Sequence, residues 1–384
     1  MNKQIINGKY TSATVFTTDN PSTSIDPYAV AQLQMLCDIE ANSNAKIKVM
    51  PDVHPGKVGT IGLTMTVHDK LMPNLTGIDI GCGISMIQIK NNNIEFQKLD
   101  TVIHDHIPSG FRVRKDIHHK IDAGFLYSLK CIKHIPLDQT LLSCGSLGSG
   151  NHFIEIDKDQ NNNHFVVVHS GSRRLGKDVT EFYLKRGQAE LKANGIDFPY
   201  ELTYLQGELM EDYLHDISIV QKFAQRNRAV ILEELAKNMK WKVTEQWNCH
   251  HNYIDFSENT IHSLGNPLLR KGAISAKKDE MVIIPINMHD GIIIGKGLGN
   301  VEWNCSAPHG SGRIMKREDV KKQHTLSQFK KVMKGIYSPS ITSATLDEAP
   351  FAYRGIDDIA ETIKETVQIT NILTPVYNFK AGGQ

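Results

Sequence analysis

Short apolar runs alternate with glycine-containing turns over much of the chain. Each run is four to seven residues long, and a polar or glycine-rich segment ends it; examples are 47–50, 61–67, 84–90, 152–157 and 165–170. Runs of this length, bounded by turn residues, are typical of buried β-strands. The pattern therefore predicts a sheet core whose strand ends carry the polar side chains.

A different periodicity appears between Lys177 and Lys242. Apolar residues recur there at steps of three and four with no proline between them, at Leu202, Leu205, Leu209, Leu214, Ile217, Val220, Ala224, Leu232, Leu235 and Met239. This spacing predicts a pair of helices laid on the sheet. Asp26-Pro27 predicts a further capped helix, and we expect a last helix over 355–369.

Strand-like segments return at 274–287 and 291–297, and no linker rich in Ser, Gly or Pro divides the chain. We therefore predict an α+β (mixed α/β) protein with a mixed β-sheet core. We expect one large domain over residues 1–384, with the helical segment 177–242 as an insertion within it.

Composition narrows the class of protein. Its 384 residues contain 43 Lys and Arg against 42 Asp and Glu, so no general positive charge indicates non-specific binding to nucleic acid. No run approaches the roughly 18 apolar residues of a membrane span. Six cysteines without regular spacing favour reduced thiols over a disulfide framework. We expect a cytoplasmic protein that has no membrane segment.

Side chains of the metal-ligand type gather in the glycine-rich turns. Asp79 and Cys82 lie three residues apart between glycines, and His152, His169 and His251 follow in similar settings. Singly, each of these has a simpler explanation, as a buried cysteine or a hydrogen-bonded core histidine. Together they favour a metal site, and a thiolate with imidazoles suggests zinc from ligand softness alone.

Arginines follow two of the histidines. Arg173 and Arg174 come after His169, and Arg313 and Arg317 come after His309, again among glycines. Guanidinium groups bind phosphate through paired hydrogen bonds, and glycine leaves backbone amides open. Although a solvated basic turn is the alternative, the pattern favours phosphate chemistry beside a metal.

Nine short motifs occur in an order that resembles the RtcB family of GTP-dependent RNA ligases. They are PDVHPGK, GIDIGCG, GSGNHFIE, HSGSRRLG, CHHN, RKGAISA, KGLGN, HGSGR and DEAPFAY, followed by a lysine near the end. The resemblance covers nearly the whole chain. It implies an enzyme of RNA repair or tRNA splicing that joins a 3′-phosphate or 2′,3′-cyclic phosphate end of RNA to a 5′-hydroxyl end.

The resemblance also implies roles for individual residues. It implies two manganese ions held by Asp79, Cys82, His152, His169 and His251, with Cys82 shared, and His309 as the nucleophile that receives a guanylate from GTP. The implied nucleotide-binding residues are Asn151, Phe153, Glu155, Asn287, Gly310, Gly312, Tyr353 and Lys380. Arg173 and Arg317 would contact RNA, and Asp52, Asn252 and Arg313 would support the site.

One segment departs from the family pattern. Where relatives continue with a Gly-Ser-Met-Gly loop, this chain has Ile286-Asn287-Met288-His289-Asp290. Two alternatives to a ligase therefore stay open. One is a dinuclear metal-dependent phosphatase or cyclic phosphodiesterase that acts on RNA ends, and the other is a non-catalytic protein that binds them.

Overall fold

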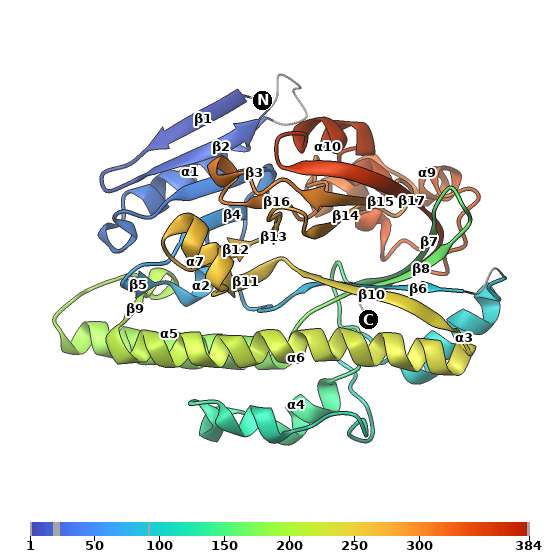
Figure 1. Cartoon of the computed structure of the whole chain (residues 1–384), viewed down its shortest axis with the longest axis horizontal. Helices are drawn as coiled ribbons and strands as arrows, with labels where there is room; N and C mark the ends of the chain where they lie inside the picture. The colour runs from blue at the N-terminus through green and yellow to red at the C-terminus, as the bar shows by residue number, and fades with distance from the viewer. Residues whose placement is uncertain (1, 18–23, 91–92, 382–384) are drawn as a thin grey trace.

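The computed structural model describes residues 2–17, 24–90 and 93–381. Two large sheets lie side by side, with long helices beneath both of them (Figure 1). The fold is mixed α+β, as the apolar pattern predicts.

The first sheet has six strands and contains both parallel and antiparallel pairs. Strands β2 and β3 run parallel, whereas the other neighbours are antiparallel. In spatial order the strands are β1 (Asn2–Asn7), β2 (Ser12–Thr17), β3 (Ile47–His54), β4 (Ile61–Thr66), β12 (Leu268–Lys271) and β11 (Asn252–Asp255). Helix α1 (Pro27–Cys37) packs on this sheet, and Asp26 caps it by accepting a hydrogen bond from the Tyr28 amide. The predicted capped helix is confirmed.

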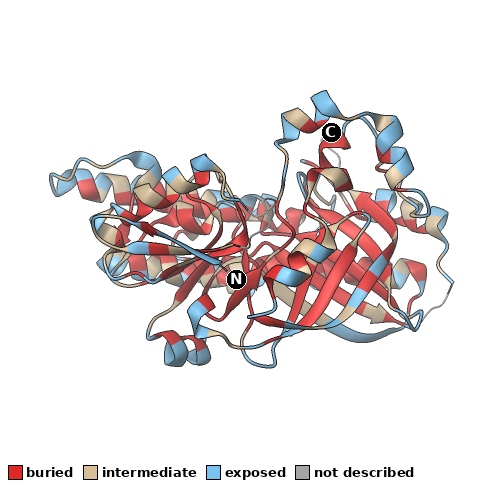
Figure 2. Ribbon diagram, turned by 90° about the horizontal axis from the view of Figure 1, so that it is seen from above, coloured by how far each residue is buried: buried red, intermediate tan, exposed pale blue. Residues whose placement is uncertain are grey.

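The second sheet has seven strands, and all its neighbouring pairs are antiparallel. In spatial order they are β10 (Val243–His250), β6 (Gly83–Ile89), β8 (His164–Ser170), β7 (Phe153–Lys158), β17 (Val367–Lys380), β15 (Gly291–Gly297) and β14 (Met281–Asn287). Two small ladders pair β13 (Ala273–Ser275) with β16 (Ser306–Pro308), and β5 (Lys70–Leu71) with β9 (Leu205–Gln206). Strand β8 is buried along its whole length. Figure 2 shows that buried residues make up most of the strands at the centre of the molecule.

The predicted helical pair is present as α5 (Arg173–Ala193) and α6 (Gly207–Met239). Helix α6 spans the length of the molecule beneath both sheets (Figure 1) and buries its apolar stripe against them. The other helices are α2 (Pro73–Thr76), α3 (Phe96–His106), α4 (Leu137–Ser143), α7 (Glu258–Leu264), α8 (Arg317–Gln323), α9 (Leu326–Val332) and α10 (Ile356–Thr362). Short 3₁₀ turns lie at Glu40–Asn42, Gly124–Ser128, Ile132–His134, Tyr200–Leu202, Val301–Trp303, Leu346–Glu348 and Pro350–Ala352.

The prediction of a last helix over 355–369 is correct for its first half and wrong for its second half. Helix α10 ends at Thr362, and the long strand β17 begins at Val367. From Val367 onward β-branched residues are frequent, which suits a strand. The strand pairs first with β15 and then with β7, and its register shifts between Pro375 and Tyr377. Proline is tolerated at such an irregularity because the ladder there needs no amide hydrogen.

Helix α6 also contributes to the centre of the molecule. Asn227 and Arg228 are completely buried and donate hydrogen bonds to loops of the seven-stranded sheet. That residues 1–384 form one catalytic domain with 177–242 as an insertion stays a prediction. In the described part of the chain, helices are too short or too polar to span a bilayer.

Candidate functional site

Four neighbouring strands of the seven-stranded sheet each have one terminus at the same end of the sheet. Cys82 directly precedes β6, and His169 is the penultimate residue of β8, where it pairs with both Ile84 and Phe153. His251 follows β10, and its amide donates to the Cys82 carbonyl at 2.9 Å. His152 directly precedes β7. The sheet register thus brings these four residues together from distant parts of the sequence.

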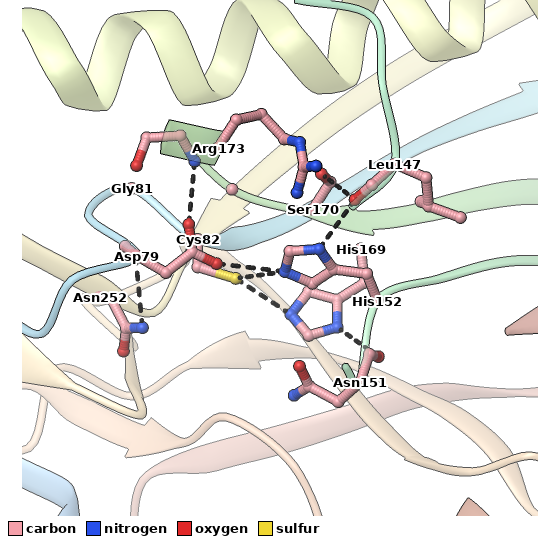
Figure 3. Close-up of polar contacts among 12 residues, drawn as sticks. Asp79, Gly81, Cys82, Leu147, Asn151, His152, His169, Ser170, Arg173 and Asn252 are labelled. Atoms are coloured by element: carbon pink, nitrogen blue, oxygen red, sulfur yellow. Dashed lines mark hydrogen bonds and ion pairs between the residues drawn. The ribbon is translucent and has the colours of Figure 1, made fainter. Parts of the chain in front are cut away.

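The side chains of Cys82, His152 and His169 form a buried cluster beside Asp79 (Figure 3). The Cys82 Sγ lies 3.5 Å from the His152 Nε2 and 3.3 Å from the His169 Nε2. The His169 Nε2 is in turn 3.3 Å from the His251 Nε2, and the His152 Nε2 is 3.1 Å from the Asp79 Oδ2. All five predicted metal-ligand side chains therefore converge, with the sulfur between two imidazoles. The ligand atoms of Cys82, His152 and His169 all lie within 4.8 Å of one another, and a thiol with two imidazoles is a donor set that fits a divalent cation.

Backbone carbonyls orient two of the rings. The His152 Nδ1 lies 2.8 Å from the Leu147 carbonyl, and the His169 Nδ1 lies 3.2 Å from the Asn151 carbonyl (Figure 3). A ring that donates through Nδ1 keeps the lone pair on Nε2, which is the nitrogen that faces the sulfur. Histidine ligands of bound metals commonly donate a hydrogen bond from their other ring nitrogen to a backbone carbonyl in this way.

The loop that carries Asp79 and Cys82 is held from several sides. Asp79 accepts a hydrogen bond from the Ser172 amide at 3.0 Å, and Asn252 donates to the Asp79 carbonyl at 3.4 Å. Gly81 has φ of +74°, and a Cβ there would lie 2.8 Å from the Cβ of Ala224 on α6. Glycine is therefore required both by the backbone conformation and by the close approach of the helix.

Burial sets the protonation of the cluster. It lowers the pKa of His169 and of His251 well below the ordinary value, so both rings are neutral and can act as ligands. Burial acts to raise the pKa of Asp79, but hydrogen bonding and charge interaction with His152 outweigh it and lower the pKa to about 2. Burial, reinforced by the Asp79 charge, raises the pKa of Cys82. A cation at the cluster would offset this cost and favour the thiolate.

A cavity opens beside the cluster. Its volume is about 830 Å³, open solvent at its mouth included. His169 and His251 line it together with His309, and the ring centroids of His251 and His309 are 4.9 Å apart. Both large sheets contribute, because His54 on β3 and Phe153 on β7 also line it. The metal-type cluster and His309 therefore share one cavity.

The predicted nucleotide-binding residues gather at this cavity. All of them line it, namely Asn151, Phe153, Glu155, Asn287, Gly310, Gly312, Tyr353 and Lys380. Phe153 and Glu155 alternate along β7 and so share one face of the sheet, and Asn151 lies in the turn just before the strand. The Lys380 Nζ lies 4.8 Å from the centroid of the Phe153 ring. The arrangement offers an aromatic face, a carboxyl group and a cation within one pocket.

Asn287 lines the cavity but uses most of its side-chain amide within its own turn. Its Oδ1 accepts from the amides of His289 and Asp290 at 2.9 Å, and its Nδ2 donates to the Asp290 carboxylate at 2.9 Å. One N–H of the amide group is left for a ligand. The departure from the family loop therefore forms a self-contained turn between β14 and β15.

The two arginines predicted to contact RNA lie in different settings. Arg173 is the first residue of α5, close to Asp79, and its guanidinium donates to the Ser146 hydroxyl at 3.1 Å and the Gly110 carbonyl at 2.8 Å. Arg317 lines the cavity and forms ion pairs with Asp347 and Glu348, with half of its side chain exposed. Arg313, also at the cavity, donates to the Tyr353 hydroxyl at 2.8 Å.

Three residues at the site were not identified from the sequence alone. Glu348 is buried at the cationic end of the cavity, where it accepts from Tyr353 at 2.6 Å and pairs with Arg313, Arg317 and Lys380. The sequence signal for Glu348 was the DEAPFAY motif. The second residue is His54, whose sequence signal was the PDVHPGK motif. The third is Arg228 on α6, which donates to the Gly81 and Ser170 carbonyls, each at 2.8 Å. An arginine inside an amphipathic helical pattern carries no signal of that position.

The cluster and the cavity form one site, in which side chains of the metal-ligand type lie beside a pocket. Residues 32–381 match the family model described as tRNA-splicing ligase RtcB, and the chain belongs to this family. It is 30% identical over 367 residues to the RNA-splicing ligase RtcB1 of Escherichia coli strain ATCC 25922, an alignment that covers 86% of this chain and 88% of that protein. It is 29% identical over 365 residues to the RNA-splicing ligase RtcB of Escherichia coli K12, with the same coverage. The tRNA-splicing ligase RtcB of Nanoarchaeum equitans is 25% identical over 399 residues, covering 83% of this chain and 84% of that protein.

Proposed function

We propose that the protein is a GTP-dependent RNA ligase of RNA repair or tRNA splicing. It joins RNA ends that carry a 3′-phosphate or a 2′,3′-cyclic phosphate to ends that carry a 5′-hydroxyl. Family membership supports RNA ligation. The feature that most supports the finer proposal is the position of His309, which shares a cavity with the Cys82 cluster and a set of nucleotide-type residues.

His309 is suited to act as a nucleophile. Its Nδ1 lies 2.7 Å from the buried carboxylate of Asp52 and donates a hydrogen bond to it. The lone pair is then on Nε2, and the carboxylate stabilises the positive charge that the ring gains on attack. Attack on the α-phosphorus of GTP forms a P–N bond and breaks the bond to the β-phosphate oxygen, which releases pyrophosphate.

Guanylation solves a chemical problem of the RNA end. A 3′-phosphate alone would have to expel oxide, which is a very poor leaving group. Transfer of the guanylate from His309 to a 3′-phosphate oxygen breaks the P–N bond and forms a phosphoanhydride. The 5′-hydroxyl then attacks the RNA phosphorus and expels GMP. A cyclic phosphate must first be hydrolysed to the 3′-phosphate.

The cluster is proposed to hold two manganese ions through Asp79, Cys82, His152, His169 and His251, with Cys82 shared between them. Bound cations would supply positive charge to a transferring phosphoryl group. Zinc suits the same donors, so the choice of manganese follows the family resemblance.

The pocket offers features that suit guanine. Phe153 presents an aromatic face, and the Glu155 carboxyl group lines the same wall. A carboxylate can accept hydrogen bonds from the ring N–H and the amino group of guanine, whereas adenine presents an acceptor at the equivalent ring nitrogen. Arg313, Arg317 and Lys380 gather around Glu348 and place three cations at the cavity, where phosphates could compete with this carboxylate for them. We propose GTP as the nucleotide on this basis.

The direct test is ligation of two synthetic RNAs, one ending in a 3′-phosphate and one beginning with a 5′-hydroxyl, in the presence of GTP and manganese. We expect a joined product that requires GTP and is absent with the His309→Ala variant. A protein that forms no joined product with any common divalent metal would contradict the proposal.

A second candidate is a metal-dependent phosphatase or cyclic phosphodiesterase that acts on RNA ends. It is favoured by one observation, the turn in which Asn287 is engaged where relatives have serines. This activity needs the Cys82 cluster but neither GTP nor His309 as nucleophile. Release of phosphate without GTP, at equal rates in wild type and His309→Ala, would identify it.

We also propose that the protein is cytoplasmic. All six cysteines are free thiols, which suits the reducing environment of the cytoplasm.

A further inference from the structure

The most exposed large apolar residue in the described part of the chain is Phe111, which is 92% accessible. It stands in the loop that follows α3, among residues that carry positive charge. Arg112 and Lys115 are also exposed, and they line a surface hollow of about 770 Å³ together with Arg114, two histidines, Asp105 and Asp116. An exposed aromatic ring beside exposed cations is the combination that single-stranded nucleic acid recognises, through stacking and phosphate contacts.

The base of this loop is tied to the metal-type cluster. The Leu147 amide donates to the Pro108 carbonyl at 2.8 Å, and the Gly110 amide donates to the Gly148 carbonyl at 2.7 Å. Arg173 closes the connection by donating to the Gly110 carbonyl at 2.8 Å. The exposed part of the loop therefore begins at a fixed point beside Arg173.

The same contacts relate Phe111 to the reacting end of a bound RNA. Leu147 accepts the hydrogen bond from His152, whose Nε2 faces Cys82 and Asp79. Phe111 directly follows Gly110, so its Cα lies about 3.8 Å from the anchored residue. Its ring is thus within reach of the first nucleotides that lead away from a phosphate bound at the cluster.

We propose that residues 110–115 dock the single-stranded segment of RNA next to the reacting end. Phe111 stacks on a base, and Arg112 and Lys115 contact phosphates. This inference rests on the proposed ligase function and adds to it a binding surface outside the catalytic cavity. A Phe111 ring that is exposed to solvent covers no neighbouring apolar group, so it does not stabilise the fold. It does present a π-face on which any base can stack.

The experiment compares Phe111→Ala with Phe111→Trp in the full chain. Affinity is measured for a long single-stranded RNA with a 3′-phosphate, for one with a 5′-hydroxyl, and for a dinucleotide with a 3′-phosphate. We expect Phe111→Ala to weaken binding of a long RNA by about 5- to 100-fold, Phe111→Trp to restore it, and the dinucleotide to bind equally to all forms. Whichever of the two long RNAs binds more weakly to Phe111→Ala than to wild type is the RNA that occupies the loop.

Salt dependence tests the cations separately. The slope of log affinity against log salt concentration should fall by about 0.7 in Arg112→Ala and in Lys115→Ala, and should not change in Phe111→Ala. Tyr200→Ala is the matched control, since Tyr200 is an exposed aromatic in the turn after helix α5 and lies outside the loop 110–115.

Self-guanylation with GTP separates this inference from the proposed function. A wild-type protein that neither guanylates nor ligates refutes the proposed function itself. If the wild type ligates and Phe111→Ala binds and joins long RNA as well as wild type does, the docking surface is refuted while the ligase stands. That second result would assign the exposed ring to a protein contact instead.

Discussion

The Asp52 Oδ2 lies 2.7 Å from the His309 Nδ1, and this contact joins the six-stranded sheet to the cavity beside the seven-stranded sheet. Asp52 is on β3 and completely buried, whereas His309 follows β16 and faces the cavity. The contact fixes both the orientation of the ring and the nitrogen that carries its proton.

Replacing Asp52 by asparagine should therefore impair guanylation of His309. An amide of the same size cannot stabilise the charged ring and can favour the wrong tautomer, so we expect a rate at least about 100-fold lower. The measurement is the rate of self-guanylation with labelled GTP, with thermal unfolding as the control for folding. A wild-type rate in Asp52→Asn would show that the carboxylate has no part in the step.

Removing the thiol of Cys82 should reduce metal binding before any chemistry occurs. The Sγ lies between His152 and His169, so Cys82→Ala removes a donor shared by both halves of the cluster. We expect manganese bound per chain, measured by titration calorimetry and elemental analysis, to fall by at least half. Cys249→Ala is the matched control, because Cys249 is a partly buried cysteine on β10 that lies outside the cluster. Equal binding by wild type and Cys82→Ala would remove Cys82 from the metal site.

Arg228 should be required for the position of the loop that carries Asp79 and Cys82. Its guanidinium is completely buried and satisfies the Gly81 and Ser170 carbonyls. Arg228→Met keeps the packing volume but removes the buried hydrogen bonds of the guanidinium to these carbonyls, to the Ser85 hydroxyl and to the Asn248 side chain, which should cost about 3 kcal/mol of unfolding free energy. Arg226→Met is the control, since the Arg226 side chain is partly exposed on the same helix. Denaturant unfolding measures both, and a difference below about 1 kcal/mol between the two variants would contradict the assigned role.

Glu155 should make stability depend on pH between about 4.5 and 7. Burial raises the pKa of Glu155 to about 7 from its ordinary 4.5, against the opposing effects of Asn378 and Lys380. Because the folded state holds this proton more tightly, the stabilisation is complete below pH 4.5 and is lost as the pH rises through 7. The change is on the order of 3 kcal/mol, measured by urea unfolding without metal or nucleotide. The neighbouring buried carboxyl group of Asp157 also has a raised pKa, from burial and the Glu155 charge. Glu155→Gln should therefore reduce the slope in this window without abolishing it, and an unchanged slope would contradict the assignment.

Much of the site follows from local sequence signals, because each candidate residue lies at a strand end or in a glycine turn. Cys82, His152, His169 and His251 were identified in this way, and the structure brings them together with Asp79. Their convergence depends on the register of β10, β6, β8 and β7, which one sequence does not specify.

The features that sequence did not predict depend on tertiary contacts. Residues 363–369 have apolar spacing that suits a helix or a strand, and the pairing of β17 with β15 decides for the strand from Val367. Arg228 sits within an ordinary helical pattern, and only the loops above α6 give it partners. Asn287 was expected to face a nucleotide, but the turn of its own hairpin uses most of its amide.

Covalent labelling of His309 tests the central claim most directly. The protein is incubated with GTP labelled at the α-phosphate and manganese, and the modified peptide is identified by mass spectrometry. His289→Ala is the matched control, because His289 is an exposed histidine in the turn between β14 and β15. We predict one acid-labile guanylate on His309, present in wild type and His289→Ala and absent in His309→Ala. A label on another residue, or equal labelling of His309→Ala, would contradict the account.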